Sequence, residues 1–330
     1  MSNPSTAKAE AASRPAATPL LDFIRAARLP LAIVVTLVLF GLVEPRVLSF
    51  GNFRNIAVQA SYLAIFAMAQ TVVILTRGFD LSLGYTVSLV SVVASMAMVA
   101  GGGDASIVYG LCAGLLVALL IGAANGVLIA GIGINPLVTT LGMSYVVLAF
   151  ASTVSGGFPV TGLPPAFNAI FAQSAPLGLP TPIWIAALTF VLLYLVLKAT
   201  RFGRSLYIVG ANPKAAVAAG IRTVPVLLIA YMLCSALTAL GALLLTARTG
   251  SGEPNLGGNL TLQAIAAAVV GGVRLSGGEG GMGSALFGAL FVTVLSNGMN
   301  LVQIDGYLQQ ICLGVIIIAS LIVSRDDARR

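Results

Sequence analysis

The sequence predicts an all-α polytopic membrane protein of about ten transmembrane helices, with a discontinuous segment near residues 76–84. Hydrophobic residues make up 58% of the chain and charged residues only 8%, and the mean hydropathy is +1.03. Soluble domains usually carry about 25% charged residues, so this chain lacks the polar surface that solubility requires. Apolar runs also recur at about 20 residues, the length that crosses a bilayer as a helix.

Ten apolar runs are candidate membrane helices, of which the third begins at a glycine-rich break and the eighth is short. Counting ten spans leaves only three of the 17 basic residues, Arg46, Arg54 and Arg248, on one side of the membrane. Because basic loops remain in the cytoplasm, both termini and the loop 201–222 are predicted to be cytoplasmic. The runs cover 24–43, 56–75, 81–99, 107–129, 137–155, 182–199, 225–247, 260–273, 283–300 and 307–324.

The domain organisation follows from these runs. Residues 1–23 are rich in Ala, Ser, Pro and Thr, and we expect a disordered cytoplasmic tail. Residues 24–324 form a single transmembrane domain, and 325–330 form a cytoplasmic C-terminal tail. The three cysteines lie apart in apolar runs and the chain has no histidine, so neither a disulfide framework, a metal site nor imidazole catalysis is expected. The net charge of +7 arises from loop asymmetry and does not indicate a nucleic-acid partner.

The loop 201–222 contains residues that commonly begin and end a very short helix. Asn212 suits the N-cap, Pro213 the first helical position, and Gly220 a left-handed C-terminus. Such a helix is either a handle for another protein or an ordinary turn in a solvated loop.

Asp80, in the stretch TRGFDLSLG, is the one carboxylate expected at membrane depth, and Arg77 is a candidate partner for it. A charge there is costly unless it is paired or hydrated. Either Asp80 lines a path through a discontinuous helix, or it caps the helix that follows. Uncharged polar residues in the spans suit either hydroxyl-rich solutes or bonds between helices: Gln59, Gln70, Asn125, Asn135, Gln263, Asn297 and Asn300.

The sequence has no motif with which this chain would itself supply energy for transport. The glycine-rich stretch GGEGGMGS at 277–284 has no lysine and is not a phosphate-binding loop. Nothing indicates an enzyme, and no cofactor is expected in this chain. If it transports a solute, a partner supplies the energy. The alternative is a secondary transporter of a small polar solute, coupled to an ion through Asp80.

Five stretches, in order, resemble the membrane permease subunits of bacterial ABC sugar importers, the ribose, xylose and galactose type. They are TVVILTRGFDLSLG (71–84), INPLVTTLGM (134–143), GGFPVTGLP (156–164), TRFGRSLYIVGANPKAAVAAGI (200–221) and LQAIAAAVVGGVRLSGGEGGMGSALFGAL (262–290). The resemblance covers about residues 50–324. It is closer to the sugar permeases than to the branched-chain amino-acid permeases.

The resemblance implies a bacterial inner-membrane subunit that forms a homo- or heterodimer. Cytoplasmic ATPase subunits, which use ATP and Mg²⁺, would dock on a coupling helix in each copy. By position that helix comprises Asn212, Pro213, Lys214, Ala215, Ala216, Ala219 and Gly220. A periplasmic solute-binding protein would meet the loops at 156–181 and 248–259. We expect five side chains to border the substrate path: Asp80, Asn125, Gln263, Asn297 and Asn300.

Four positions depart from the family pattern. Arg77 stands where glycine is usual, and Arg274 replaces a small residue in a glycine-rich turn. Thr261 and Gln263 occupy two positions of which one or both are commonly acidic. Arg77 either pairs with Asp80 or reaches the lipid headgroups, and any of the four departures is compatible with a different solute.

Overall fold

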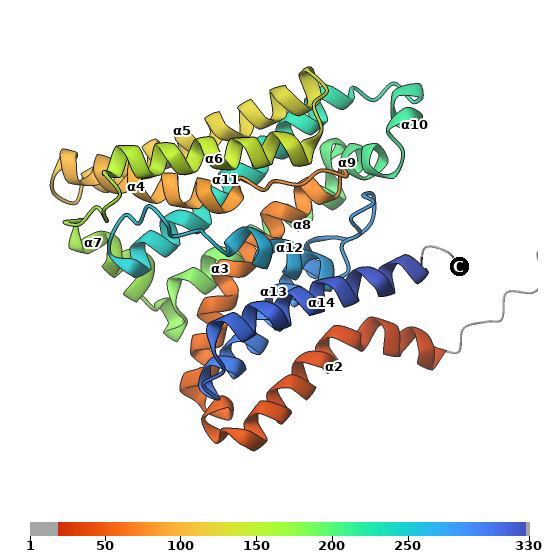
Figure 1. Cartoon of the computed structure of the whole chain (residues 1–330), viewed down its shortest axis with the longest axis horizontal. Helices are drawn as coiled ribbons and strands as arrows, with labels where there is room; N and C mark the ends of the chain where they lie inside the picture. Colours follow the sequence, from red (N-terminus) through yellow and green to blue (C-terminus); the bar gives the residue numbers. More distant parts are fainter. Residues whose placement is uncertain (1–18, 328–330) are drawn as a thin grey trace, which may run out of the picture.

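The structure is a computed structural model that describes residues 19–327, with side chains described over 28–319. This part is mostly helical (Figure 1), and it contains one isolated bridge, between Val160 and Gly252. The long helices are α2 (Pro19–Val43), α3 (Phe50–Ile74), α4 (Leu83–Gly101), α5 (Ser106–Gly126), α6 (Pro136–Ser155), α8 (Thr181–Ala199), α11 (Thr223–Thr249), α13 (Met282–Leu301) and α14 (Gly306–Asp327). The shorter ones are η2 (Pro45–Leu48), η3 (Val127–Gly131), α7 (Pro165–Asn168), η4 (Ala169–Gln173), η5 (Pro176–Gly178), α9 (Arg201–Ala211), α10 (Pro213–Ala218) and α12 (Leu260–Val270).

Seven helices of the described part are long and apolar enough to cross a membrane: α3, α4, α5 with η3, α6, α8, α11 and α13. The three other predicted spans correspond to shorter apolar stretches in α2, α12 and α14. These stretches are Arg28–Val43, Leu260–Val270 and Gly306–Ala319. The multi-pass class is therefore supported, whereas the expectation of about ten spans is not confirmed.

Helix α3 forms the centre of the molecule. Every residue from 60 to 76 is buried, and α3 packs against α8, α11, α12 and α13. Outer helices such as α6 expose large apolar side chains, for example Val138 and Tyr145. A helix that is apolar all round belongs in the interior, and an outer helix in lipid has no need of a polar face.

The fold contains two discontinuous units of the same design. Helix α3 is followed by the irregular segment 75–82 and then α4, while α11 is followed by the irregular segment 250–259 and then α12. The break expected near 76–84 is therefore present. The N-terminal ends of α4 and α12 meet, since a Cβ on Gly257 would lie only 1.8 Å from the Gly84 carbonyl oxygen.

The packing around the two units is also alike. Helix α11 packs on α5 and α3 packs on α13, while α4 contacts α5 and α6 as α12 contacts α13 and α14. Helices α3 and α11 run in opposite directions, because α3 ends beside Gly210 whereas α11 begins just after α10. This is the arrangement of an inverted repeat, a common basis of transporter folds.

A row of hydroxyls on α4 hydrogen-bonds the segment 250–259. Gly257 N donates to Ser88 Oγ (3.1 Å) and Glu253 N donates to Ser91 Oγ (3.1 Å). Irregular backbone at membrane depth requires such partners, because no water satisfies it. The loop 248–259, expected to meet a periplasmic binding protein, thus packs against α4 through these bonds.

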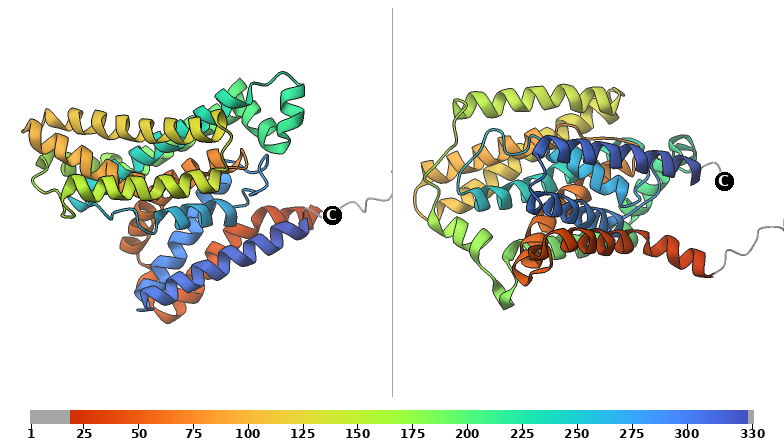
Figure 2. Two further views of the ribbon diagram at one scale, coloured as in Figure 1. Left: turned by 45° about the horizontal axis from the view of Figure 1, so that its top comes forward. Right: turned by 60° about the horizontal axis from the view of Figure 1, so that its bottom comes forward.

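Both ends of the described chain lie at the same end of the molecule as α9 and α10 (Figure 1), and the views in Figure 2 agree. Helix α2 begins at Pro19, before the expected residue 24, and α14 continues to Asp327. Residues 1–18 and 328–330, which belong to the expected tails, lie outside the described residues.

Candidate functional site

A cavity of about 380 Å³ lies between α3, α11, α12, α13 and α14. Helix α11 starts beside α10 and reaches the cavity near its far end, through Leu245 and Arg248, so the cavity lies toward the end of the molecule opposite α10. Its volume falls in the range of small-molecule sites, about 300–1,000 Å³.

The cavity lining combines apolar and uncharged polar side chains. Arg248 is the single charged residue of this lining, and its guanidinium lies 5.5 Å from the centre of the Tyr62 ring. Carboxamides both donate and accept hydrogen bonds, as sugar hydroxyls do, and a lining without carboxylates has no counterion for a cation. Its polar members besides Arg248 and Tyr62 are Gln59, Asn259, Gln263, Thr293, Ser296, Asn300, Gln309 and Gln310.

Two of the five expected path residues, Gln263 and Asn300, line this cavity. Asn300 Oδ1 accepts a hydrogen bond from Gln309 Nε2 (2.8 Å), which joins α13 to α14. Three other residues of the lining, Asn259, Gln309 and Gln310, were not predicted from the sequence. The adjacent glutamines Gln309 and Gln310, within the apolar run 307–324, were the sequence feature that could have indicated a polar lining.

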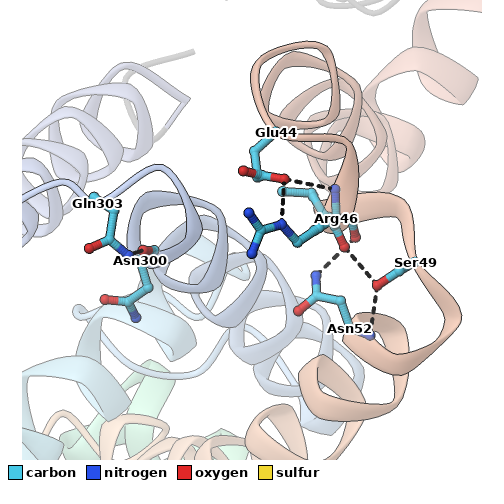
Figure 3. A network of polar contacts seen from close by, with 7 residues as sticks. Glu44, Arg46, Ser49, Asn52, Asn300 and Gln303 are labelled. Carbon is cyan, nitrogen blue, oxygen red and sulfur yellow. Dashed lines mark hydrogen bonds and ion pairs between the residues drawn. The ribbon is translucent and has the colours of Figure 1, made fainter.

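Asn297 lies on the same helix but does not line the cavity. It is buried, and its Oδ1 accepts from Asn52 Nδ2 (2.9 Å). The same amide nitrogen also donates to Val47 O (2.9 Å), so Asn52 joins α13 to the turn between α2 and α3. Figure 3 shows this turn, where hydrogen bonds link Glu44, Arg46, Ser49 and Asn52. Asn297 therefore makes a bond between helices.

Asp80 is buried in the first discontinuous segment, away from the cavity lining. Its Oδ1 accepts from the backbone N (2.9 Å) and Oγ (2.5 Å) of Ser82, and the Cys234 thiol lies 3.8 Å from Oδ2. Asn125, also buried, donates from Nδ2 to Ser82 Oγ (3.0 Å). Hydrogen bonds of this kind compensate a buried carboxylate, and they hold the turn from which α4 begins.

Arg77 is not paired with Asp80, contrary to one of the two expectations. The two ion pairs among the described side chains are Glu44–Arg46 and Arg274–Glu279. The Arg77 guanidinium instead donates to the carbonyl oxygens of Gly210 and Ala211 at the end of α9.

The helix caps expected at Asn212 and Gly220 are confirmed. Asn212 Oδ1 accepts from the backbone N of Lys214 and of Ala215 (3.1 Å each), Pro213 begins α10, and Gly220 has φ 78°. Ala216 is fully buried, whereas Val217 is 61% exposed. Residues 213–215 and 217–220 are all exposed, so α10 presents Lys214 together with small and apolar side chains at the surface.

Two other departures have defined contacts. Thr261 Oγ1 accepts from Gly84 N (2.8 Å) where α4 meets α12, whereas Arg274 forms an ion pair with Glu279 (2.9 Å). Tyr207 on α9 donates to Gly280 O (2.9 Å) in the same glycine-rich loop, and burial raises the pKa of its phenol, which keeps it a donor.

Among the described residues no group of three or more His, Cys, Asp or Glu is placed to hold a metal ion.

A multi-pass helical bundle with two discontinuous helices and an amide-lined cavity has the features of a membrane transport permease. The chain belongs to the family described as branched-chain amino acid transport system / permease component, whose profile matches residues 52–321.

Several relatives are named as sugar permeases. The ribose import permease protein RbsC of Escherichia coli (strain K12) is 34% identical over 296 residues, covering 89% of this chain and 91% of the relative. RbsC of Bacillus subtilis (strain 168) is 33% identical over 299 residues, covering 90% and 92%. The galactose/methyl galactoside import permease protein MglC of Salmonella typhimurium is 33% identical over 304 residues, covering 86% and 90%. No solved structure matches the chain.

Proposed function

We propose that this chain is the permease subunit of an ATP-driven importer of a sugar or sugar-like solute. The observation that carries the proposal is the cavity lined by carboxamides and hydroxyls, with Arg248 as its single charged residue. Uncharged amides give a polyhydroxylated solute directional but modest binding, which suits a transit site. The named relatives import or transport ribose, allose and galactose.

In this proposal Gln263 and Asn300 contact the solute directly. Asp80, Asn125 and Asn297 lie outside the cavity lining and bond to other side chains or to backbone, so they stabilise the helices around the path and do not contact the solute. The location of Asp80 outside the cavity lining favours ATP drive over ion coupling at Asp80.

Helix α10 is the proposed docking site for a cytoplasmic ATPase, which binds ATP and Mg²⁺. A short, capped helix with exposed alanines and Val217 is a compact body that fits a groove on a partner. The other proposed partners are a periplasmic solute-binding protein at the opposite end and a second permease copy, both as the relatives' importer class implies.

We further propose that the chain lies in the bacterial inner membrane with both termini and α10 in the cytoplasm. Both ends of the described chain lie at one end of the molecule (Figure 2), as an even number of crossings requires. Helices α2, α12 and α14, which are not among the seven candidate spans, then complete ten spans. The basic residues that flank α10 support this side as the cytoplasmic one.

The test is ATP-dependent uptake of radiolabelled D-ribose into proteoliposomes that contain the permease with its ATPase and binding protein. Ala215→Asp places a charge on the exposed face of α10 and should abolish uptake while insertion into the membrane is retained. Ala215→Ser is the matched neutral control and should retain uptake. Normal uptake by the Asp variant would refute the docking role of α10. Uptake that persists without ATPase and collapses with an uncoupler would instead indicate ion coupling.

A further inference from the structure

Three backbone segments from distant parts of the chain meet at the end of the molecule that carries α10. We call this contact of Leu75–Arg77, Gly210–Ala211 and Gly277–Gly278 the three-way junction. Gly278 N donates to Leu75 O (3.0 Å), and a Cβ on Gly210 would lie 1.7 Å from Leu75 O and 2.7 Å from Gly278 N. A Cβ on Gly278 would lie 2.8 Å from the Cα of Ala211. The segments touch backbone to backbone, so none of them shifts without displacing the others.

Arg77 links two of these segments through its side chain. Its Nε donates to Gly210 O and its Nη2 donates to Ala211 O, the last two carbonyls of α9. The final carbonyls of a helix have no partner within the helix, and a cation beside them is favoured by the helix dipole. The planar guanidinium presents two N–H donors to both acceptors in a fixed geometry, whereas an ammonium group is a compact point charge on a flexible stem.

The backbone of Arg77 shows that this position does not arise from local preference. Its φ is 68°, in the left-handed region that favours glycine. A non-glycine residue is held there only when the surrounding structure determines its conformation. The two bonds to α9, and the close approach of Gly277 to the Arg77 side chain, provide that determination.

The junction connects α10 to both discontinuous units. Ala211 leads through the cap Asn212 directly into α10, and Arg77 leads into the segment that holds Asp80 and begins α4. Gly277 and Gly278 lie in the irregular loop that joins α12 to α13 (Figure 1). A displacement of α10 therefore reaches α4 and α12 through one rigid contact.

We propose that Arg77 is a positioning residue for transport, which ties α9 and α10 to the discontinuous segment 75–82 and so transmits a push on α10 to the helices around the cavity. This inference rests on the proposed function, because it takes α10 as the site of the push. Arg77 touches no solute. Its role is to make the movement of α10 and that of segment 78–82 a single movement.

Arg77→Gly is the decisive variant, because glycine adopts a φ of 68° without cost and the backbone is retained. Arg77→Lys keeps the charge but not the two-pronged donor. Arg274→Ala is the matched control, since it removes an arginine from the same loop as Gly277 and Gly278, and the side chain of Arg274 pairs with the exposed Glu279 and with no residue of the junction. Proteoliposomes with the ATPase and binding protein are supplied with D-ribose, and ATP hydrolysis and sugar uptake are measured together.

We expect Arg77→Gly to raise the number of ATP molecules hydrolysed per sugar imported by about tenfold, since charge-assisted bonds that transmit the movement are lost. Arg77→Lys should lie between Arg77→Gly and the wild type, and Arg274→Ala should match the wild type. A merely structural cap would lower the amount of folded protein and leave this ratio unchanged. An unchanged ratio in Arg77→Gly overturns the inference.

A second measurement separates this inference from the proposed function. Amide hydrogen exchange of residues 78–82 is followed with and without the nucleotide-bound ATPase, which requires no sugar. In the wild type, exchange in this segment should change when the ATPase is added, and in Arg77→Gly it should not. A wild type that neither binds the ATPase nor imports sugar refutes the proposed function. A wild type that does both, while Arg77→Gly transmits the same change, refutes the role of Arg77 alone.

Discussion

The Thr261 hydroxyl accepts a hydrogen bond where the N-terminal ends of α4 and α12 meet, and Thr261→Val tests its contribution. Gly84 lies in the first turn of α4, where a backbone N–H has no acceptor within the helix. Thr261 Oγ1 is its acceptor at 2.8 Å, and the Gly84–Gly257 contact is so close that no water has room to replace it. Valine has nearly the same shape as threonine, so the variant removes the acceptor without opening a cavity.

The expected cost follows from the buried donor. Leaving one buried N–H without a partner costs about 1–3 kcal/mol, and Thr261 is only 8% exposed. Thr261→Ser is the control: it keeps the hydroxyl and loses one methyl group, which costs about 0.8 kcal/mol. We therefore expect the valine variant to be the less stable of the two.

The free energy of unfolding is measured in mixed micelles by titration with a denaturing detergent, with helicity followed by circular dichroism. Thr261→Val should lower the free energy of unfolding by about 1–3 kcal/mol relative to the wild type. If Thr261→Val is as stable as Thr261→Ser, the hydroxyl is not a required partner of Gly84. The interpretation of the α4–α12 contact would then be wrong.

Two further predictions distinguish a residue that lines the cavity from a residue that bonds one helix to another. Gln263→Ala removes a carboxamide from the cavity lining and should weaken the apparent affinity for D-ribose about fivefold, the effect of losing a hydrogen bond worth about 1 kcal/mol, with stability unchanged. Asn297→Ala leaves the half-buried Asn52 amide without one partner and should lower the free energy of unfolding by about 1 kcal/mol, with the order of preference among ribose, allose and galactose unchanged in uptake assays. Reversed outcomes for the two variants would contradict the placement of the substrate path.

The candidate site was only partly accessible from sequence. Asn and Gln residues in apolar runs suit both solute contacts and bonds between helices, and nothing local distinguishes these uses. Gln263 and Asn300 line the cavity, whereas Asn297 contacts Asn52, 245 positions away in the chain. The serines of α4 show the same limit, because their spacing marks one helix face but does not name its partner segment.

The sequence by itself determined the membrane class, the position of the break after α3 and the caps of α10. These depend on composition or on bonds that reach across two or three residues, such as Asn212 to Lys214 and Ala215. The tertiary structure alone decided the partner of Arg77, which lies 133 positions away, and the five elements that enclose the cavity. A cation at a turn has several energetically similar partners within its reach, and only the packed backbone determines which carbonyls are close enough to accept.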